Sequence, residues 1–183
     1  MKTSDTMKQV DISEMPDSVI AGSEETGHEI SGEGTMDCET PDSGSVKLTD
    51  TIRIRVPFFD VDSIKMVWHG NFVKYLEEGR ESFGFRFGLE YMHIYDSGYV
   101  APIADMHLEY KNAAGIGDTL IVETTYKPCR GAKLMFDYVI RRESDGELIL
   151  KASTVQLFVT RDGVFEVSTP GFYAEWRKKW KLL

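Results

Sequence analysis

The sequence has only two cysteines in 183 residues, Cys38 and Cys129. They lie far apart and match no metal-ligand spacing, so neither a disulfide framework nor a cysteine-based metal site is expected. No apolar run approaches the roughly 20 residues of a membrane-spanning helix. The N-terminus, MKTSDTMKQVDISEMP, also lacks the apolar core of a secretory signal. These absences predict a cytoplasmic protein without a transmembrane segment.

Aromatic residues are absent from residues 1–47, which are rich in Ser, Thr, Gly, Asp and Glu. This stretch has 3 Lys/Arg and 11 Asp/Glu, a net charge of −8, whereas residues 48–183 have 18 and 19, a net charge of −1. A segment of such composition cannot bury enough apolar surface to offset its ordering entropy. We therefore expect an acidic flexible extension at 1–47 and one folded domain at 48–183. The nearly neutral domain lacks the clustered basic charge that binds nucleic acid.

Apolar periodicity predicts one strand, one long helix and then several strands. Ile52, Ile54 and Val56 alternate with arginines, which is typical of a strand. Residues 71–87 place apolar side chains at helical spacing, with Asn71 as the expected N-cap, Gly88 as the end and Gly79 at a close approach to another element. Strands are expected at 99–112, 118–128, 132–143, 147–160 and 164–168. The basic tail at 174–183 predicts a terminal helix, with a membrane- or partner-binding tail as the alternative.

Two carboxylates, Asp60 and Asp62, come directly after the first strand and lie among apolar residues. A carboxylate in apolar surroundings is poorly solvated and therefore reactive as a base or nucleophile. A pair of solvated loop carboxylates is the alternative. Residues 68–71 place backbone N–H groups at the start of the long helix, where such groups lack intrahelical acceptors and can stabilise an oxyanion.

The stretch FFDVDSIKMVWHGNFVKYLEEGRESF, residues 58–83, resembles the signature of the 4-hydroxybenzoyl-CoA thioesterase branch of the hotdog superfamily. In that signature Asp-x-Asp follows a strand and precedes an apolar pair, an aromatic residue, Tyr or His, a small residue, Asn or Ser, an aromatic residue, and a helix with an Arg. The matching residues here are Asp60, Asp62, Met66-Val67, Trp68, His69, Gly70, Asn71, Phe72 and Arg80. The resemblance extends over residues 50–165. One departure is Ser63-Ile64-Lys65, where the family usually has Gly or Ala; Lys65 is expected to alter the loop or to place a cation near the site.

The resemblance implies an α+β hotdog fold, in which a five- to six-stranded antiparallel sheet wraps a long central helix. It implies a homodimer or homotetramer with active sites at the subunit interface. Asp62 matches the catalytic carboxylate, and His69 matches the residue whose backbone N–H polarises the thioester carbonyl. In branches with His at this position, the resemblance implies that the side chain assists. The implied substrate-binding residues are Trp68 and Phe72 in the acyl pocket, Gly70 and Asn71 in the adjoining turn, and Arg130 and Lys133 at the coenzyme A. Asp60 is expected to have a structural role.

The expected function is hydrolysis of an acyl-CoA or acyl carrier protein thioester to free acid and thiol, with Asp62 as nucleophile or general base. No metal and no cofactor are expected, apart from coenzyme A as part of the substrate, because no zinc ligand set or nucleotide loop is recognisable. One alternative is a non-catalytic hotdog protein that binds an acyl-CoA or acyl chain. A second is a hotdog hydratase or dehydratase, whose local Asp/His sequence is not found. A third takes the carboxylate from the helix, at Glu77, Glu78 or Glu81, although these positions suit the solvated face.

Overall fold

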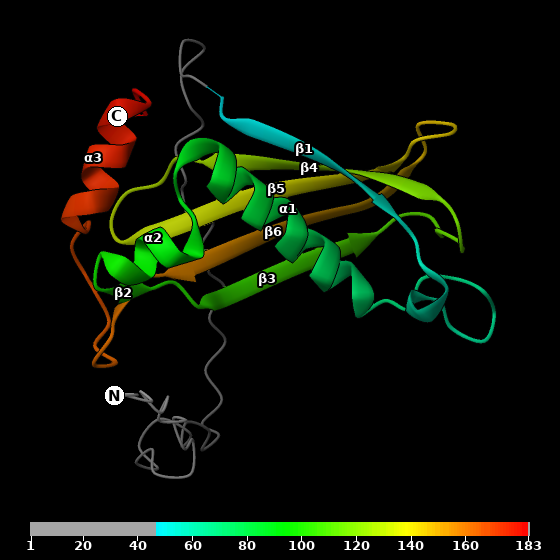
Figure 1. Cartoon of the computed structure of the whole chain (residues 1–183), viewed down its shortest axis with the longest axis horizontal. Coiled ribbons are helices and arrows are strands. Elements are labelled where there is room, and N and C mark those ends of the chain that lie inside the picture. The colour runs from blue at the N-terminus through cyan, green and yellow to red at the C-terminus, as the bar shows by residue number, and fades with distance from the viewer. Residues whose placement is uncertain (1–46, 183) are drawn as a thin grey trace, which may run out of the picture. The chain divides into compact units, whose positions relative to one another are not determined.

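The long helix predicted over residues 71–87 is the element around which the domain is built. The computed structural model describes residues 47–182, so the predicted acidic extension lies outside the described residues except for Lys47. Helix α1 (Asn71–Phe87) lies on one face of a five-stranded antiparallel sheet (Figure 1). The strands, in the order in which they pair, are β1 (Thr49–Arg55), β4 (Thr119–Lys127), β5 (Lys133–Arg142), β6 (Leu148–Leu157) and β3 (Ile103–Tyr110). This is the expected α+β hotdog architecture.

Short elements connect and flank these layers. They are the 3-10 helix η3 (Phe58–Asp60), α2 (Tyr91–Asp96), β2 (Tyr99–Val100), β7 (Val159–Thr160) and α3 (Gly171–Lys179). The strand expected at 99–112 is divided into β2 and β3, with Pro102 in the break, because proline cannot donate to a strand ladder. The prediction of a strand at 164–168 is wrong. Phe165 makes only a single bridge to Val159, and no strand among the described residues pairs along this stretch.

The predicted C-terminal end of α1 is correct, and the predicted N-cap is one residue away from the observed one. Gly88 ends the helix in the left-handed conformation, with φ of 84°, which glycine adopts without steric cost. At the other end the N-cap is Gly70, not Asn71, and it has no side-chain capping bond. Asn71 is instead the first helical residue, and its Nδ2 donates to the backbone oxygen of Asp60 at 2.9 Å. A long-range contact has therefore taken the side chain that a local cap would use.

The core lies between α1 and the sheet, where alternate residues of β4 and β5 are buried. From α1, Tyr75, Leu76 and Phe83 are at most 2% exposed. The opposite, outer face of the sheet carries charged and threonine side chains, some of them joined in ion pairs such as Lys127–Asp137. The period of two along these strands therefore separates an apolar face from a solvated one.

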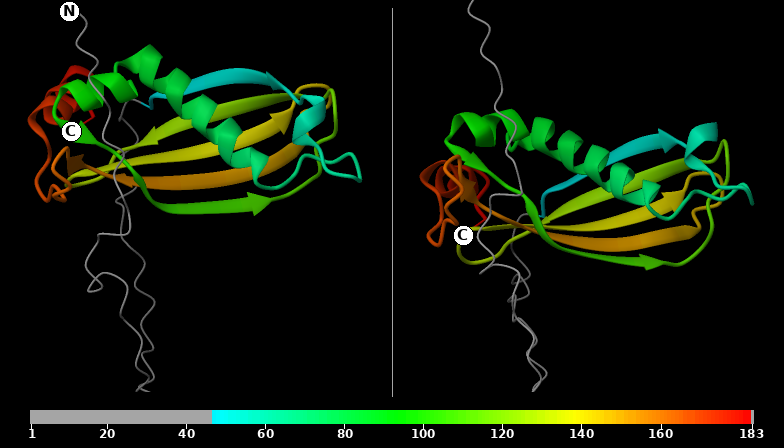
Figure 2. Two further views of the ribbon diagram at one scale, coloured as in Figure 1. Left: turned by 60° about the horizontal axis from the view of Figure 1, so that its bottom comes forward. Right: turned by 90° about the horizontal axis from the view of Figure 1, so that it is seen from below.

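The C-terminal helix predicted from the basic tail is α3, and it closes one end of the domain (Figure 2). The indole N–H groups of Trp176 and Trp180 both donate to the backbone oxygen of Phe87, at 2.7 and 3.0 Å. The hydroxyl groups of Tyr173 and Tyr126 are 2.7 Å apart. These bonds satisfy a carbonyl at the end of α1 and fix α3 to the sheet. Within residues 47–182, no helix has the length and apolar character needed to cross a membrane.

Gly79 allows α1 to approach the sheet, so we predict that Gly79→Ala destabilises the domain. A Cβ at this position would lie 2.6 Å from Thr124 Oγ1 and 3.0 Å from Val122 Cγ1. Overpacking costs about 1–3 kcal/mol, which exceeds the gain of about 1 kcal/mol in helix propensity. Urea unfolding should therefore give a net loss of about 1 kcal/mol. Gly171→Ala in α3 is the matched control, because its Cβ would meet open space; an equal effect of the two substitutions would contradict the packing argument.

Candidate active site

The segment from Asp60, the last residue of η3, to the start of α1 forms a tight loop that contains both predicted carboxylates. Backbone bonds close it, from Asp62 N to Met66 O at 2.8 Å and from Trp68 N to Asp60 O at 2.9 Å. Its tip is turned by Lys65, whose φ of 66° lies in the left-handed region. The loop is therefore a short hairpin that returns the chain to the start of α1.

A second loop supports this hairpin from the sheet. Met66 bridges to Gly115, and Val67 N donates to Ala114 O at 2.9 Å. Arg142 holds the supporting loop in turn, because its guanidinium donates to Ala113 O at 2.6 Å and to Asp118 Oδ2 at 3.2 Å. The hairpin is thus tied to the end of the sheet at which β4 begins.

Asp60 is buried and anchors the hairpin to α1. Its Oδ2 accepts a hydrogen bond of 2.8 Å from the Tyr75 hydroxyl, and its backbone oxygen accepts the Asn71 side chain. The Lys74 ammonium is 4.0 Å from Oδ1, which has no hydrogen-bond partner among the described residues. Burial, together with the Asp60 carboxylate, raises the pKa of the Tyr75 hydroxyl, so Tyr75 remains a donor. The expectation of a structural role for Asp60 agrees with these contacts.

Asp62 is half-exposed and organises the loop with only one of its oxygens. Oδ1 accepts the backbone N–H groups of Ile64 at 3.0 Å and Met66 at 3.2 Å. Oδ2 receives no hydrogen bond from residues 47–182. The carboxylate is therefore held in a fixed orientation while one oxygen stays available for chemistry.

The start of α1 supplies the backbone donors. Across the described part of the chain, the N–H groups of His69 and Gly70 have no hydrogen-bond acceptor. Trp68 covers this turn, and a Cβ at Gly70 would overlap its indole ring. The Tyr110 hydroxyl donates to His69 O at 3.1 Å and ties the turn to β3. The predicted site residues Asp62, Trp68, His69, Gly70 and Asn71 thus belong to one loop and one helix start.

Three other predicted residues are placed differently. Phe72 is buried in the core, edge-on to Tyr75 and Tyr110, so it supports the turn from behind. Arg130 and Lys133 follow the far end of β4, whereas the Asp62 loop lies where β4 begins. A nine-residue strand spans about 30 Å. One chain therefore does not bring Arg130 and Lys133 together with Asp62.

The helix carboxylates Glu77, Glu78 and Glu81 are exposed, as the helical pattern predicted. Glu77 is 3.3 Å from the buried guanidinium of Arg80, which also donates to the Tyr91 hydroxyl at 2.7 Å. The expected pairing of Arg80 with a carboxylate is therefore present. Sequence reasoning missed Tyr75 and Tyr110 as supports of the site, because their partners lie 15 and 41 residues away. Only the helical phase of Tyr75, three residues from Phe72, hinted at its burial.

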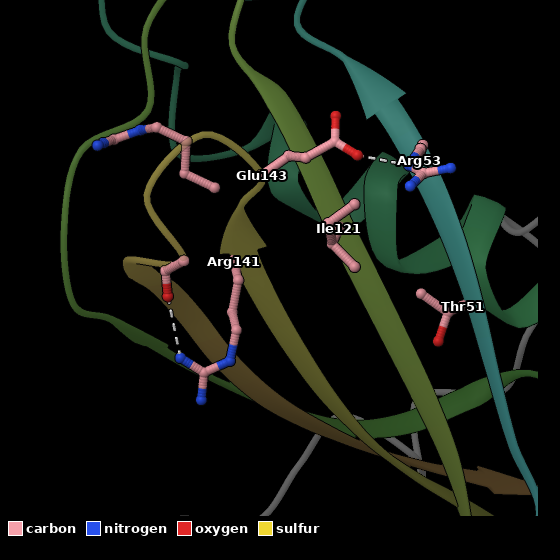
Figure 3. A pocket seen from close by; sticks show the side chains of 7 residues that line it. Thr51, Arg53, Ile121, Arg141 and Glu143 are labelled. Atoms are coloured by element: carbon pink, nitrogen blue, oxygen red, sulfur yellow. Dashed lines mark hydrogen bonds and ion pairs between the residues drawn. The ribbon is translucent and has the colours of Figure 1, made fainter.

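A hollow on the outer face of the sheet is a separate feature (Figure 3). It is lined by Thr51, Arg53, Ile121, Arg141, Arg142, Glu143 and Gly146. Its cations are engaged locally, because Arg53 Nε donates to Glu143 at 2.6 Å and Arg141 donates to Gly146 O at 3.2 Å. No residue of the Asp62 loop lines it, so we place the candidate active site at that loop. In residues 47–182, no group of three or more His, Cys, Asp or Glu side chains could hold a metal ion.

One segment carries both an oriented carboxylate, with one oxygen that residues 47–182 leave unengaged, and a turn at the start of α1 whose amides have no acceptor in the same part of the chain. Such a pair can deliver a nucleophile to a carbonyl carbon while the amides, with the helix dipole, stabilise the oxyanion. On this fold, these features are the ones expected of a hotdog protein of the acyl-CoA thioesterase class. The chain belongs to the thioesterase-like superfamily, whose family model matches residues 56–176.

Individual relatives agree with this assignment. One relative is YneP of Bacillus subtilis (strain 168), which is provisionally named an acyl-CoA thioesterase. The two sequences are 25% identical over 123 residues, which cover 67% of this chain and 88% of the relative. The chain is 24% identical over 133 residues, covering 68% and 94%, to the 4-hydroxybenzoyl-CoA thioesterase of Pseudomonas sp. (strain CBS-3). The DHNA-CoA thioesterase structure from Staphylococcus aureus shares the fold, with a TM-score of 0.66, 20% identity and coverage of 73% and 89%.

We predict that Tyr75→Phe loosens the site from its anchor. The substitution keeps the ring but leaves Asp60 Oδ2 buried without its donor, and a buried acceptor left unsatisfied costs about 1–3 kcal/mol. Urea unfolding should show this loss. Tyr110→Phe is the comparison, because it removes an exposed hydrogen bond to the same turn and should cost less. The anchor would be refuted by a Tyr75→Phe protein as stable as the wild type.

Proposed function

We propose that this protein hydrolyses acyl-CoA thioesters, with Asp62 as the catalytic carboxylate. The observation that supports the proposal is that the two carboxylate oxygens of Asp62 differ in their hydrogen bonds. Its Oδ1 is fixed by Ile64 and Met66, and its Oδ2 is unengaged by residues 47–182. Oδ2 either attacks the thioester carbon or takes a proton from a water molecule that attacks it.

The N–H groups of His69 and Gly70 are the proposed donors to the developing oxyanion. A single donor of this kind is typically worth about 3–4 kcal/mol. The C–S bond breaks as the tetrahedral intermediate collapses, and the sulfur leaves as the thiolate of coenzyme A or of an acyl carrier protein. If Oδ2 attacked, the acyl group is left as a mixed anhydride on Asp62, which a water molecule then hydrolyses to the free acid and the restored carboxylate. If Oδ2 took a proton from water, that proton passes to the departing thiolate. The proposed reaction uses only the Asp62 carboxylate and the backbone amides of His69 and Gly70, and coenzyme A takes part only as a portion of the substrate. Trp68 is proposed to contact the acyl group, with Phe72 behind it. Location in the cytoplasm stays a prediction from the low cysteine content.

We further propose that the active protein is a dimer formed through β3. This strand is an edge of the sheet, and edges with unpaired backbone groups are natural sites of strand addition. Helix α1 contacts β1 and β4, whereas Ile103 and Tyr110 on β3 remain exposed. Antiparallel pairing of two β3 strands would place Arg130 and Lys133 of one chain at the same end as Asp62 of the other. In this dimer, they are the proposed contacts for the phosphates or pantetheine of the coenzyme A bound there.

Asp62→Asn tests the catalytic role and should reduce kcat by about 10²–10⁴-fold. The amide keeps an oxygen for Ile64 and Met66, so the loop and the stability should be retained. Turnover is measured on a panel of acyl-CoAs with a reagent for the released thiol. Ser63→Ala is the control for a change within the loop. Undiminished turnover of Asp62→Asn would refute the mechanism, and binding of acyl-CoA without turnover by the wild type would favour the non-catalytic alternative.

The dimer proposal predicts a particle of at least twice the 20.8 kDa chain mass in sedimentation equilibrium. Ile103→Lys should weaken the assembly, because it puts a charge at the proposed strand interface. Ile121→Lys, on the outer face of the sheet, should leave it unchanged. A monomer at the concentration at which wild-type turnover is measured would contradict this part of the proposal.

A further inference from the structure

The peptide bond between His69 and Gly70 carries one of the two amide groups proposed to stabilise the oxyanion. It is the central peptide of a four-residue turn, which is closed by the bond from Asn71 N to Trp68 O at 2.8 Å. Gly70 has φ of −67° and ψ of −24°, and His69 is not among the described residues with positive φ. A closed turn with negative φ at both central residues is of type I.

A turn with glycine at its third position has a second conformation within reach. In a type II turn this residue has φ of about +80°, which glycine adopts without steric cost. Between the two types the central peptide rotates by about 150–170°, while the closing hydrogen bond is kept. Because the peptide is trans, its C=O and N–H groups point in opposite directions. The rotation would therefore put the His69 oxygen, an acceptor, where the Gly70 N–H had been a donor.

Packing, not turn type, requires glycine at this position. The Trp68 indole covers the turn, and a Cβ at Gly70 would lie 2.0 Å from its Cζ3 atom. A side chain that would disfavour the type II turn is therefore excluded. Since the closing bond is common to both types, the orientation of the central peptide has to be fixed from outside the turn.

The Tyr110 hydroxyl supplies this restraint. It donates to His69 O at 3.1 Å, and no other donor within residues 47–182 bonds this oxygen. Tyr110 is the last residue of β3 and pairs with Leu150 of β6. Its ring is edge-on to that of the buried Phe72, with 5.7 Å between the ring centroids. The hydroxyl is therefore held by the sheet and the core, not by the turn that it restrains.

We infer that Tyr110 is a positioning residue, which holds the Gly70 N–H in the orientation that lets it donate to the substrate. Because it bonds the carbonyl of the same peptide, it opposes the rotated conformation, in which His69 O would lose this bond. Donation to the carbonyl also polarises the peptide and strengthens its N–H as a donor. The inference rests on the proposed hydrolysis, since there the Gly70 amide meets a developing oxyanion.

Tyr110→Phe tests the role in turnover. It keeps the ring and its contact with Phe72, so KM for an acyl-CoA should not change. The kcat should fall by about three- to tenfold, because a hydrogen bond of ordinary strength no longer biases the peptide. Tyr95→Phe is the matched control, because Tyr95 is 45% exposed, against 50% for Tyr110, and lies on α2, beyond the end of α1. An unchanged kcat, or a rise in KM alone, would overturn the inference.

Two tyrosine analogues separate the hydrogen bond from the shape of the side chain. In place of Tyr110, 4-aminophenylalanine keeps a donor at the end of the ring and should bring kcat back toward that of the wild type. The other analogue, 4-methoxyphenylalanine, keeps the oxygen but has no proton to donate, so it should resemble Tyr110→Phe. Equal kcat values for the two analogues would show that the side chain acts through packing, which would overturn the inference.

The restraint on the peptide can be measured without turnover. His69-Gly70 is the one His-Gly pair in the sequence. A chain with 13C-labelled histidine carbonyl groups and 15N-labelled glycine therefore gives a single carbonyl-linked amide signal. In Tyr110→Phe the His69 carbonyl resonance should move upfield, because its hydrogen bond is lost, and Tyr95→Phe should leave it in place. A resonance that Tyr110→Phe does not move would overturn the restraint.

Together, the two measurements distinguish a failure of this inference from a failure of the proposed function. A moved resonance with unchanged kcat would leave the hydrolysis standing and overturn the positioning role. A wild type without turnover would remove the hydrolysis and the role of Tyr110 in it. The carbonyl resonance would then still show whether Tyr110 holds the peptide.

Discussion

The buried hydrogen bond between Tyr75 and Asp60 is the interaction on which the candidate site depends. It joins the second turn of α1 to the hairpin that carries Asp62, and the Asn71 side chain adds a second tie to the same residue. A carboxylate two residues from a buried anchor has little freedom to move. The backbone amides of His69 and Gly70 belong to the same assembly, so carboxylate and donors keep their relative position. Preorganised donors of this kind need no reorganisation when charge develops on the substrate.

The same constraint explains why the site lies at the end of the sheet. Helix α1 begins beside Asp60, and Gly79 lets its middle approach Val122 and Thr124. At its other end the indoles of Trp176 and Trp180 hold the Phe87 carbonyl. The helix is therefore fixed at its start, middle and end. The turn with the N–H groups of His69 and Gly70 therefore adjoins a rigid element, which would hold the proposed donors in place better than a flexible loop would.

Local pattern predicted the elements, and long-range contact decided the details. The spacing of Phe72, Leu76, Phe83 and Phe87 identified α1, because one apolar stripe is enough to determine a long helix. It could not reveal that Asn71 would donate to Asp60 instead of capping the helix, since both bonds suit the same side chain. The apolar residues at 164–168 matched a strand, yet a strand needs a neighbour that the local sequence does not specify. Likewise, the resemblance proposed Arg130 and Lys133 for the site, whereas the strand register separates them from Asp62 within one chain.

Lys65 shows how a departure from the family pattern can leave the site intact. The turn requires the left-handed conformation at Lys65. This conformation costs a residue with a side chain about 1–2 kcal/mol in free energy, whereas glycine adopts it without that cost. The hairpin keeps its shape because several bonds oppose that cost. Asp62 Oδ1 accepts two backbone N–H groups across the turn, and Lys65 N itself donates to Asp62 O at 3.0 Å. The carboxylate proposed for catalysis thus also stabilises the strained turn, which gives a physical reason for the Oδ1 oxygen to be engaged while Oδ2 accepts no hydrogen bond from residues 47–182.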